Sequence, residues 1–242
     1  MREIPNRRDL LTLGAAALVA LAGEPAAFAD SSQRQPARLE TCLFNFKDDV
    51  SAQDTSQAIA TVKAFAASSG SGGFLIGRNF IPTPFPARFE WIYMIQFEAA
   101  GATGGATAYA GFPRVRDALL ALCRNQVDCE MDVALPPHYA DARGVGVRHT
   151  VMFNFKPDAS ADARQRIVDT IRGMGKLPMV QHYIVEKNIS YAPETTKMEW
   201  QVIGDFANVE HYRAYSQAPI HLAIREDFTA QTSRVAFLDT QL

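Results

Sequence analysis

The sequence has little net charge and no run of basic residues. Among its 242 residues, Lys and Arg number 24 against 26 Asp and Glu, which gives a formal net charge of -2. Proteins that bind nucleic acid usually carry a basic excess gathered into patches or stripes. The composition therefore predicts no nucleic-acid partner. A hydrophobic content of 48% with 21% charged residues is instead typical of a globular chain that can bury a core.

The histidines and glycines lack the spacing of common metal and phosphate motifs. No H-E-x-x-H pattern occurs, and the glycine-rich stretch GATGGA at 101–106 is not followed by Gly-Lys-Ser/Thr. The sequence therefore predicts no metal, no cofactor and no phosphate-binding loop. We interpret His138, His182 and His211 as surface or hydrogen-bonded histidines, which are the commoner kinds.

No hydrophobic run is long enough to cross a membrane, but the first residues are typical of an export signal. A twin arginine at positions 7 and 8 precedes a mildly apolar stretch at 10–22, and the sequence AFA at 27–29 fits a cleavage site. The apolar stretch is too short to span about 30 Å of hydrocarbon. We interpret residues 1–29 as a twin-arginine signal peptide. We expect a periplasmic or secreted protein with no membrane association after its removal.

Cysteine is scarce, with Cys42, Cys123 and Cys129 as the full set. In an exported protein, three cysteines suggest one disulfide and one remaining thiol. Cys123 ends a helix-like stretch and Cys129 opens a strand-like one, so a short turn could bring them together; Cys42 in the first strand could also neighbour Cys129. The alternative is three buried thiols acting as small hydrophobes. No cysteine adjoins a histidine or lies in a C-x-x-C motif, which argues against redox catalysis.

The chain contains the same pattern twice. The stretch TCLFNFKDDVSA at 41–52 returns as TVMFNFKPDASA at 150–161, an offset of 109 residues that still relates Trp91 to Trp200. Identities kept in register over roughly 100 residues fit the usual size of one domain. The sequence therefore predicts two related domains.

Towards the end of each copy the best offset falls, relating Tyr109 to Tyr215 at 106 and Asp132 to Asp239 at 107. A short insertion in the first copy, within the stretch AAGATGGATAY, would explain the change. We place the domains at 38–134 and 147–242, with a linker at 135–146.

The second copy alternates between strand-like and helix-like patterns. Apolar side chains and one histidine fall on a single face of the first strand at period two: His149, Val151, Phe153 and Phe155. Ser160 is positioned to cap a following helix. The later elements expected are strands at 179–188 and 197–206, a helix at 208–231 broken at Pro219, and a strand at 234–239.

That order is the split βαβ, or ferredoxin-like, arrangement, in which helices cover one face of an antiparallel sheet. The other face needs a partner, and two such sheets packed face to face bury both. The sequence thus predicts an α+β fold of two ferredoxin-like domains packed sheet to sheet as a pseudo-dimeric α/β barrel. Because one chain completes this association, we expect a monomer.

Three segments of the second copy, RHTVMFNFKPDAS, YSQAPIHLAI and FLDTQL, carry a resemblance. They are similar to the stress-responsive α/β-barrel (Dabb) domain family, in which a His precedes an apolar strand and a Tyr is followed by Pro-x-His. The resemblance covers 147–242. The family includes a plant polyketide cyclase, and its cavity residues correspond to His149, His221 and Tyr215. The chain departs from the family pattern at Ala218, where a further His is usual.

The first copy departs further from the family. Glu40 stands at the position of His149, and Val115 at the position of His221. The resemblance therefore implies that only the second copy could carry imidazole chemistry.

Two functions follow from the resemblance. One is the binding of a small hydrophobic molecule in a pocket of the second domain. The other is a cofactor-independent cyclase or lyase in which His149 and His221, with ordinary pKa values near about 6.5, transfer protons at neutral pH. Haem binding is a weaker alternative, since it rests only on other barrels of this architecture. The sequence does not identify a ligand or a reaction.

Overall fold

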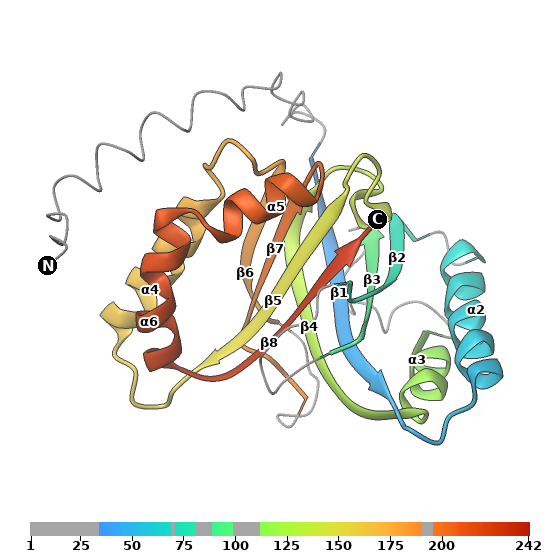
Figure 1. The fold of residues 1–242 in the computed structure, drawn as a ribbon. Coiled ribbons are helices and arrows are strands. Elements are labelled where there is room, and N and C mark those ends of the chain that lie inside the picture. Colours follow the sequence, from blue (N-terminus) through green and yellow to red (C-terminus); the bar gives the residue numbers. More distant parts are fainter. Residues whose placement is uncertain (1–33, 69–70, 81–88, 99–111, 190–195) are drawn as a thin grey trace, which may run out of the picture.

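The computed structural model describes residues 34–68, 71–80, 89–98, 112–189 and 196–242 (Figure 1). The predicted signal peptide at 1–29, the glycine-rich stretch at 101–106 and Tyr109 lie outside the described residues.

The described residues form two halves with the same order of strands. The first half contains β1 (Gln35–Phe46), α2 (Ala52–Ser68), β2 (Gly73–Arg78), β3 (Trp91–Glu98), α3 (Phe112–Leu120) and β4 (Cys123–Leu135). After a short 3-10 turn, η3 (Tyr139–Asp141), the second half contains β5 (Val147–Phe155), α4 (Ala161–Met174), β6 (His182–Lys187), β7 (Trp200–Phe206), α5 (Val209–Ser216), α6 (Pro219–Gln231) and β8 (Thr232–Gln241). Each element predicted for the second copy is therefore confirmed.

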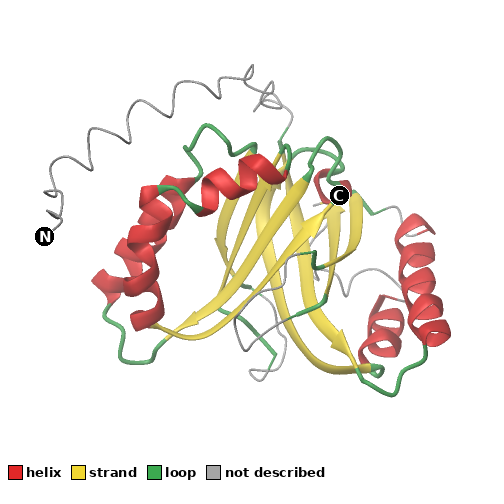
Figure 2. Cartoon of the chain, viewed as in Figure 1, coloured by secondary structure: helices red, strands yellow, loops and turns green. Residues whose placement is uncertain are grey.

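The two sheets have matching topology, β2-β3-β1-β4 and β6-β7-β5-β8, and all pairs are antiparallel. They face each other at the centre of the molecule, with α2 and α3 on one outer side and α4, α5 and α6 on the other (Figures 1 and 2). The space between the sheets is filled by apolar side chains from both halves, including Leu39, Leu43, Met94, Met152, Ile203 and Leu238. The predicted α+β fold with sheets packed face to face is confirmed.

Alternation along β5 sorts its side chains between two environments, as predicted. Phe153 and Phe155 pack with the helices of the second half, whereas Met152 points into the core between the sheets. Ser160 caps α4 by accepting a hydrogen bond from the Ala163 amide at 3.2 Å. Pro219 occupies the first turn of α6, where its missing amide costs nothing, so the chain breaks there and a new helix begins.

Two seams join the sheets into a barrel. At one, the Phe80 amide donates to the Asp239 carbonyl at 3.0 Å beside the Asn79–Thr240 bridge. The strands approach so closely here that a Cβ atom on Gly77 would lie 2.3 Å from the Thr240 methyl group. At the other seam, the Met198 amide donates to the Asp128 carbonyl at 3.1 Å. The first half therefore touches the second directly at Asp239.

The register corrects one predicted correspondence between the copies. β1 pairs Glu40 with Glu130, and β5 pairs His149 with Asp239, so the offset of 109 residues continues to the last strand. Asp132, matched to Asp239 from the sequence, instead lies opposite Arg38, which donates to it at 2.8 Å. The counterpart of Asp239 is Glu130. An insertion in the first copy would therefore have to be offset by an equally long deletion before β4.

All three cysteines are free. Cys123 and Cys129 both belong to β4, where six residues of extended chain separate their Cα atoms by about 20 Å, too far for a disulfide. Cys42 packs on the helix side of the first sheet, whereas Cys129 faces the core between the sheets. The turn expected between Cys123 and Cys129 was wrong. Of the three buried thiols expected in the alternative, Cys42 and Cys129 are buried, whereas Cys123 is partly exposed.

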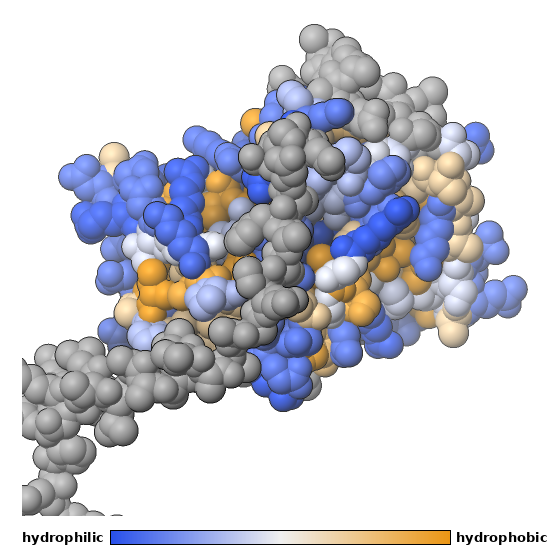
Figure 3. Space-filling view, turned by 90° about the horizontal axis from the view of Figure 1, so that it is seen from above, coloured by the Kyte–Doolittle hydropathy of each residue, from blue (hydrophilic) through white to orange (hydrophobic). Residues whose placement is uncertain are grey.

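No helix among the described residues is long and apolar enough to cross a membrane. On the face seen from above, hydrophilic side chains predominate, and hydrophobic residues are visible between them (Figure 3). Among the described residues, the exposed large apolar side chains are Ile189, Leu222 and Leu242. They lie apart in the sequence, after β6, on α6 and at the last residue.

Candidate functional site

His149 lies on the helix-facing side of β5 and is 8% exposed. Its Nδ1 atom lies 2.6 Å from Oδ1 of Asp239, the residue directly opposite on β8. Asp239 is itself 1% exposed. The pairing of the two strands thus fixes a buried imidazole against a buried acidic side chain.

Tyr215 and His221 come to the same place from the helix layer. Tyr215, on α5, is 1% exposed, and its ring centroid lies 6.0 Å from that of His149. His221 follows the break at Pro219, and its ring centroid lies 4.9 Å from that of Tyr215. The structure therefore brings all three residues proposed from the sequence into one cluster, with Tyr215 between the two imidazoles.

Further aromatic side chains surround this cluster. The Tyr183 hydroxyl on β6 lies 2.8 Å from the Tyr215 hydroxyl, and the Tyr212 ring lies 5.6 Å from the His149 ring. Phe206 contacts both Tyr212 and Tyr215, with centroids 5.5 and 4.9 Å away. The imidazoles thus stand in largely apolar surroundings that also offer phenol hydroxyls.

Burial sets the protonation states of the cluster. Desolvation, assisted by the charges of His149 and Arg225, lowers the pKa of His221 to about 4. Its Nδ1 atom is buried and makes no hydrogen bond within the described part of the chain. Desolvation also raises the pKa of Tyr215 to about 12. At neutral pH His221 is therefore an uncharged imidazole, and Tyr215 keeps its proton.

The contact between His149 and Asp239 orients the imidazole. When a carboxylate accepts the hydrogen from Nδ1, the other ring nitrogen, Nε2, keeps its lone pair and can accept a proton. This is the arrangement by which a carboxylate orients a general base. The cluster therefore combines an oriented proton acceptor, a neutral imidazole and a phenol donor.

The first half has lost these groups, as the sequence predicted. Glu40 occupies the place of His149, is buried, and accepts a hydrogen bond from the Tyr93 hydroxyl at 2.9 Å. Desolvation raises the pKa of Glu40 to about 8, although the Tyr93 hydrogen bond opposes the shift. Val115 on α3 packs against the apolar residues of that half. The strand register thus confirms a carboxyl group at the position of His149, whereas the correspondence of Val115 to His221 stays a prediction.

Sequence reasoning missed Asp239, Tyr212 and Tyr183. Asp239 lies within the segment FLDTQL, which carries part of the family resemblance, but its role depends on strand register. The two tyrosines lie on separate elements, and only packing of α5 against the sheet brings them together.

The remaining histidines lie elsewhere. His138 is exposed and lies 3.3 Å from Asp141, His211 is on α5, and His182 is on β6 near Asp205. Within the described ranges, no group of three or more His, Cys, Asp or Glu residues is placed to hold a metal ion.

Comparison with known families identifies residues 147–242 as matching the stress responsive A/B barrel domain. No curated protein sequence matches the chain. Two solved structures share its two-domain architecture. A putative monooxygenase from Fusobacterium nucleatum covers 86% of this chain and 92% of its own, at 9% identity and a TM-score of 0.56. An anthrone oxidase-like protein covers 86% and 91%, at 9% identity and a TM-score of 0.57.

A Dabb family protein from Mesorhizobium loti with a ferredoxin-like fold covers 40% of this chain and 95% of its own, at 22% identity and a TM-score of 0.35. At these identities the solved structures show the fold alone. The match to the stress responsive A/B barrel domain thus covers residues 147–242, and the described residues have the architecture of two ferredoxin-like domains.

Proposed function

We propose that the second half binds a small hydrophobic molecule beside His149, Tyr215 and His221. The observation that carries this proposal is the buried Nδ1 atom of His221, a half-buried and uncharged imidazole, which has no hydrogen-bond partner in the described chain. A buried polar atom without a partner costs free energy unless a ligand or water satisfies it. A ligand hydroxyl or phenol would supply the missing hydrogen bond.

The helix above the cluster offers a route of entry. None of the residues of α6 is fully buried, and its apolar side chains Ile220, Ile224 and Phe228 are only partly covered where they pack on the core of the second half. Because the helix buries so little apolar surface, its displacement costs little free energy. The proposed ligand enters beneath α6 and contacts the aromatic side chains below it.

A cofactor-independent cyclase or lyase is the second candidate, favoured by the contact of 2.6 Å between His149 and Asp239. In this proposal His149 Nε2 removes a proton from the bound molecule, and the Tyr215 and Tyr183 hydroxyls stabilise negative charge that develops on its oxygen. His221, uncharged at neutral pH, holds the ligand by accepting a hydrogen bond.

We also propose that the protein acts outside the cytoplasm. The twin arginine and the AFA sequence support removal of residues 1–29 during export. The mature chain would then consist of the domain at 38–134, the linker at 135–146 and the domain at 147–242.

Native mass spectrometry of the mature protein tests the binding proposal. We expect a bound small molecule that is retained by a Glu40→Ala variant and lost from a His221→Ala variant of equal melting temperature. Retention of the molecule by both variants would place it outside the proposed site.

The catalytic candidate has a separate test. If the protein converts the molecule it binds, His149→Ala should lower kcat by roughly 100-fold or more, as expected when a general base is removed. Glu40→Ala should leave kcat unchanged. If His149→Ala instead only lowers stability, by about 1–3 kcal/mol, and binding persists, the imidazole is structural.

A further inference from the structure

A second site is a groove of about 500 Å³ at the facing edges of the two sheets, and it meets the histidine cluster at Tyr183. One wall is the end of β4 with Pro136, and the other is β6 from His182 to Glu186. Both strands are at the edge of their sheets. Just beyond β6 the Ile189 amide donates to the Glu130 carbonyl of β4 at 2.8 Å, but among the described residues no backbone hydrogen bond joins β4 to β6 along the groove itself. The barrel is therefore open at this place.

Basic side chains gather around the groove. Arg34 approaches it from the start of the described chain, and Arg172 and Lys176 approach from the end of α4. Glu186 is the one acidic residue among its lining side chains. Three basic side chains and one acidic side chain therefore line the groove. Of these, Arg172 also lies 4.0 Å from Asp169 on the same helix and donates to the Val185 carbonyl at 3.5 Å.

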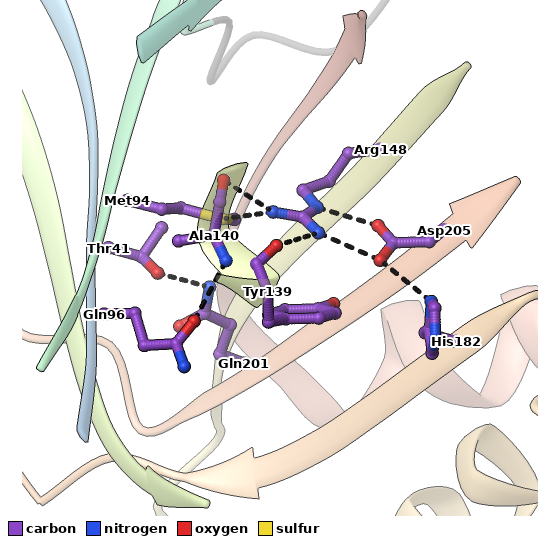
Figure 4. A network of polar contacts seen from close by, with 9 residues as sticks. All are labelled: Thr41, Met94, Gln96, Tyr139, Ala140, Arg148, His182, Gln201 and Asp205. Carbon is purple, nitrogen blue, oxygen red and sulfur yellow. Dashed lines mark hydrogen bonds and ion pairs between the residues drawn. The ribbon is translucent and has the colours of Figure 1, made fainter. Parts of the chain in front are cut away.

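The floor of the groove adds no unbalanced negative charge. Asp205 lies behind His182, at 3.7 Å, but is paired with Arg148 through hydrogen bonds of 2.7 and 2.9 Å (Figure 4). Arg148 is 0% exposed, and its remaining donors reach the Tyr139 and Ala140 carbonyls. Because this buried pair is neutral as a whole, the rim sets the charge of the groove.

The walls between these charges combine apolar side chains with the polar side chains of Gln181, His182 and Tyr183. Val133, Leu135, Ile184 and Val185 line them together with the ring of Tyr139. The Tyr139 side chain is buried, stacks against the Arg148 guanidinium and borders the groove. A groove with apolar side chains along its walls and basic side chains at its rim suits an amphiphilic anion.

We propose that this groove binds a small hydrophobic carboxylate. The carboxylate lies at the rim with Arg172 and Lys176, and the hydrocarbon part lies between the edges of β4 and β6. The volume is within the range of about 300–1,000 Å³ usual for small-molecule sites. Arg172 and Lys176 are exposed at the rim, where they can hold a carboxylate through charge-assisted hydrogen bonds. This site is distinct from the one proposed around His149, although Tyr183 borders the groove and its hydroxyl contacts Tyr215 in the histidine cluster.

Octanoate is a suitable probe, with 1-octanol and octylammonium as controls of matched chain length. Isothermal titration of the protein should show binding of octanoate and weaker or no binding of the two controls. In the double variant Arg172→Gln/Lys176→Gln, the Kd for octanoate should rise about tenfold or more, equivalent to about 1.4 kcal/mol. Arg166→Gln, on an exposed position of the same helix, should leave the Kd within about twofold.

Several outcomes would overturn the proposal. Equal binding of octanoate and 1-octanol would mean that the positive charges do not select the ligand. An unchanged Kd in the double variant would place octanoate elsewhere. Loss of octanoate binding in His149→Ala, but not in the double variant, would assign it to the histidine cluster. The variant Tyr139→Phe removes the hydroxyl and keeps the ring beside Arg148. Weaker octanoate binding by this variant, with an unchanged melting temperature, would support a contact between the ligand and the hydroxyl.

Discussion

Nδ1 of His149 lies 2.6 Å from Oδ1 of Asp239, and both residues are buried where β5 pairs with β8. This contact orients the imidazole towards Tyr212 and Tyr215 in the helix layer. It also ties the candidate site to the barrel, because the Asp239 carbonyl accepts the Phe80 amide of the first half. The site thus depends on both halves, although its imidazoles come from one.

Asp239→Asn should lower the free energy of unfolding by about 1 kcal/mol, since a hydrogen bond to a charged acceptor becomes a neutral one. Urea denaturation at neutral pH measures the change. Asp227→Asn, on the exposed face of α6, is the control and should have little effect. Equal stability of the two variants would show that the contact with His149 contributes nothing to folding.

Glu40→Gln should change how stability depends on pH. The pKa of Glu40 is about 8 in the folded chain, above the ordinary value of 4.5, so the folded state holds this proton more tightly. The protonated Glu40 therefore contributes to the free energy of unfolding in full below pH 4.5, and this contribution is lost as the pH rises to about 8. The free energy of unfolding falls over this range by at most about 1.4 kcal/mol per pH unit.

Between pH 5 and 8 the wild type should therefore lose stability relative to Glu40→Gln, whose amide can still accept the Tyr93 hydrogen bond. Urea denaturation at several pH values gives the difference. Glu90→Gln, a half-exposed position on the same half, serves as control. Parallel curves for wild type and Glu40→Gln would show that Glu40 titrates normally.

The fold could be predicted from the sequence because its signals are local or repeated. Alternation along β5 and the cap at Ser160 depend on neighbouring residues, and the duplicated FNFK stretch indicated two sheets that bury each other. Strand register is not local, so Asp239 was aligned with Asp132 when its true counterpart is Glu130.

The candidate site was predictable only in part. His149, His221 and Tyr215 came from a family resemblance, and their proximity required the packing of α5 and α6 on the sheet. Asp239 lies 90 residues from His149, and no spacing in the sequence indicates such a pair. The cysteine count suggested a disulfide that does not form, because strand β4 extends through both Cys123 and Cys129 and holds them apart.

The mature protein should be a monomer. Its two sheets bury each other within one chain, so the face through which single-domain barrels would associate is already covered. Sedimentation velocity at micromolar concentration measures the mass in solution. A stable dimer would reveal an additional interface outside the barrel core.

Export should depend on the twin arginine. Replacing Arg7 and Arg8 together with Lys should leave the precursor in the cytoplasm, whereas Arg2→Lys should be exported normally. Cell fractionation and N-terminal sequencing provide the readout, with Asp30 as the expected first residue of the mature chain. Normal export of the double variant would rule out the twin-arginine interpretation.

The central claim is that His149 and His221 form a ligand site, and NMR of the mature protein labelled at its histidine rings tests it most directly. The chain has five histidines, so each ring gives a resolvable signal. When small phenols and aromatic ketones are added, we predict that at least one compound shifts the His149 and His221 signals together. His138 and His211 should not respond, and His182 reports separately on the groove. If the compounds that bind leave both the His149 and the His221 signals unchanged, or if no compound binds, the proposed site is contradicted.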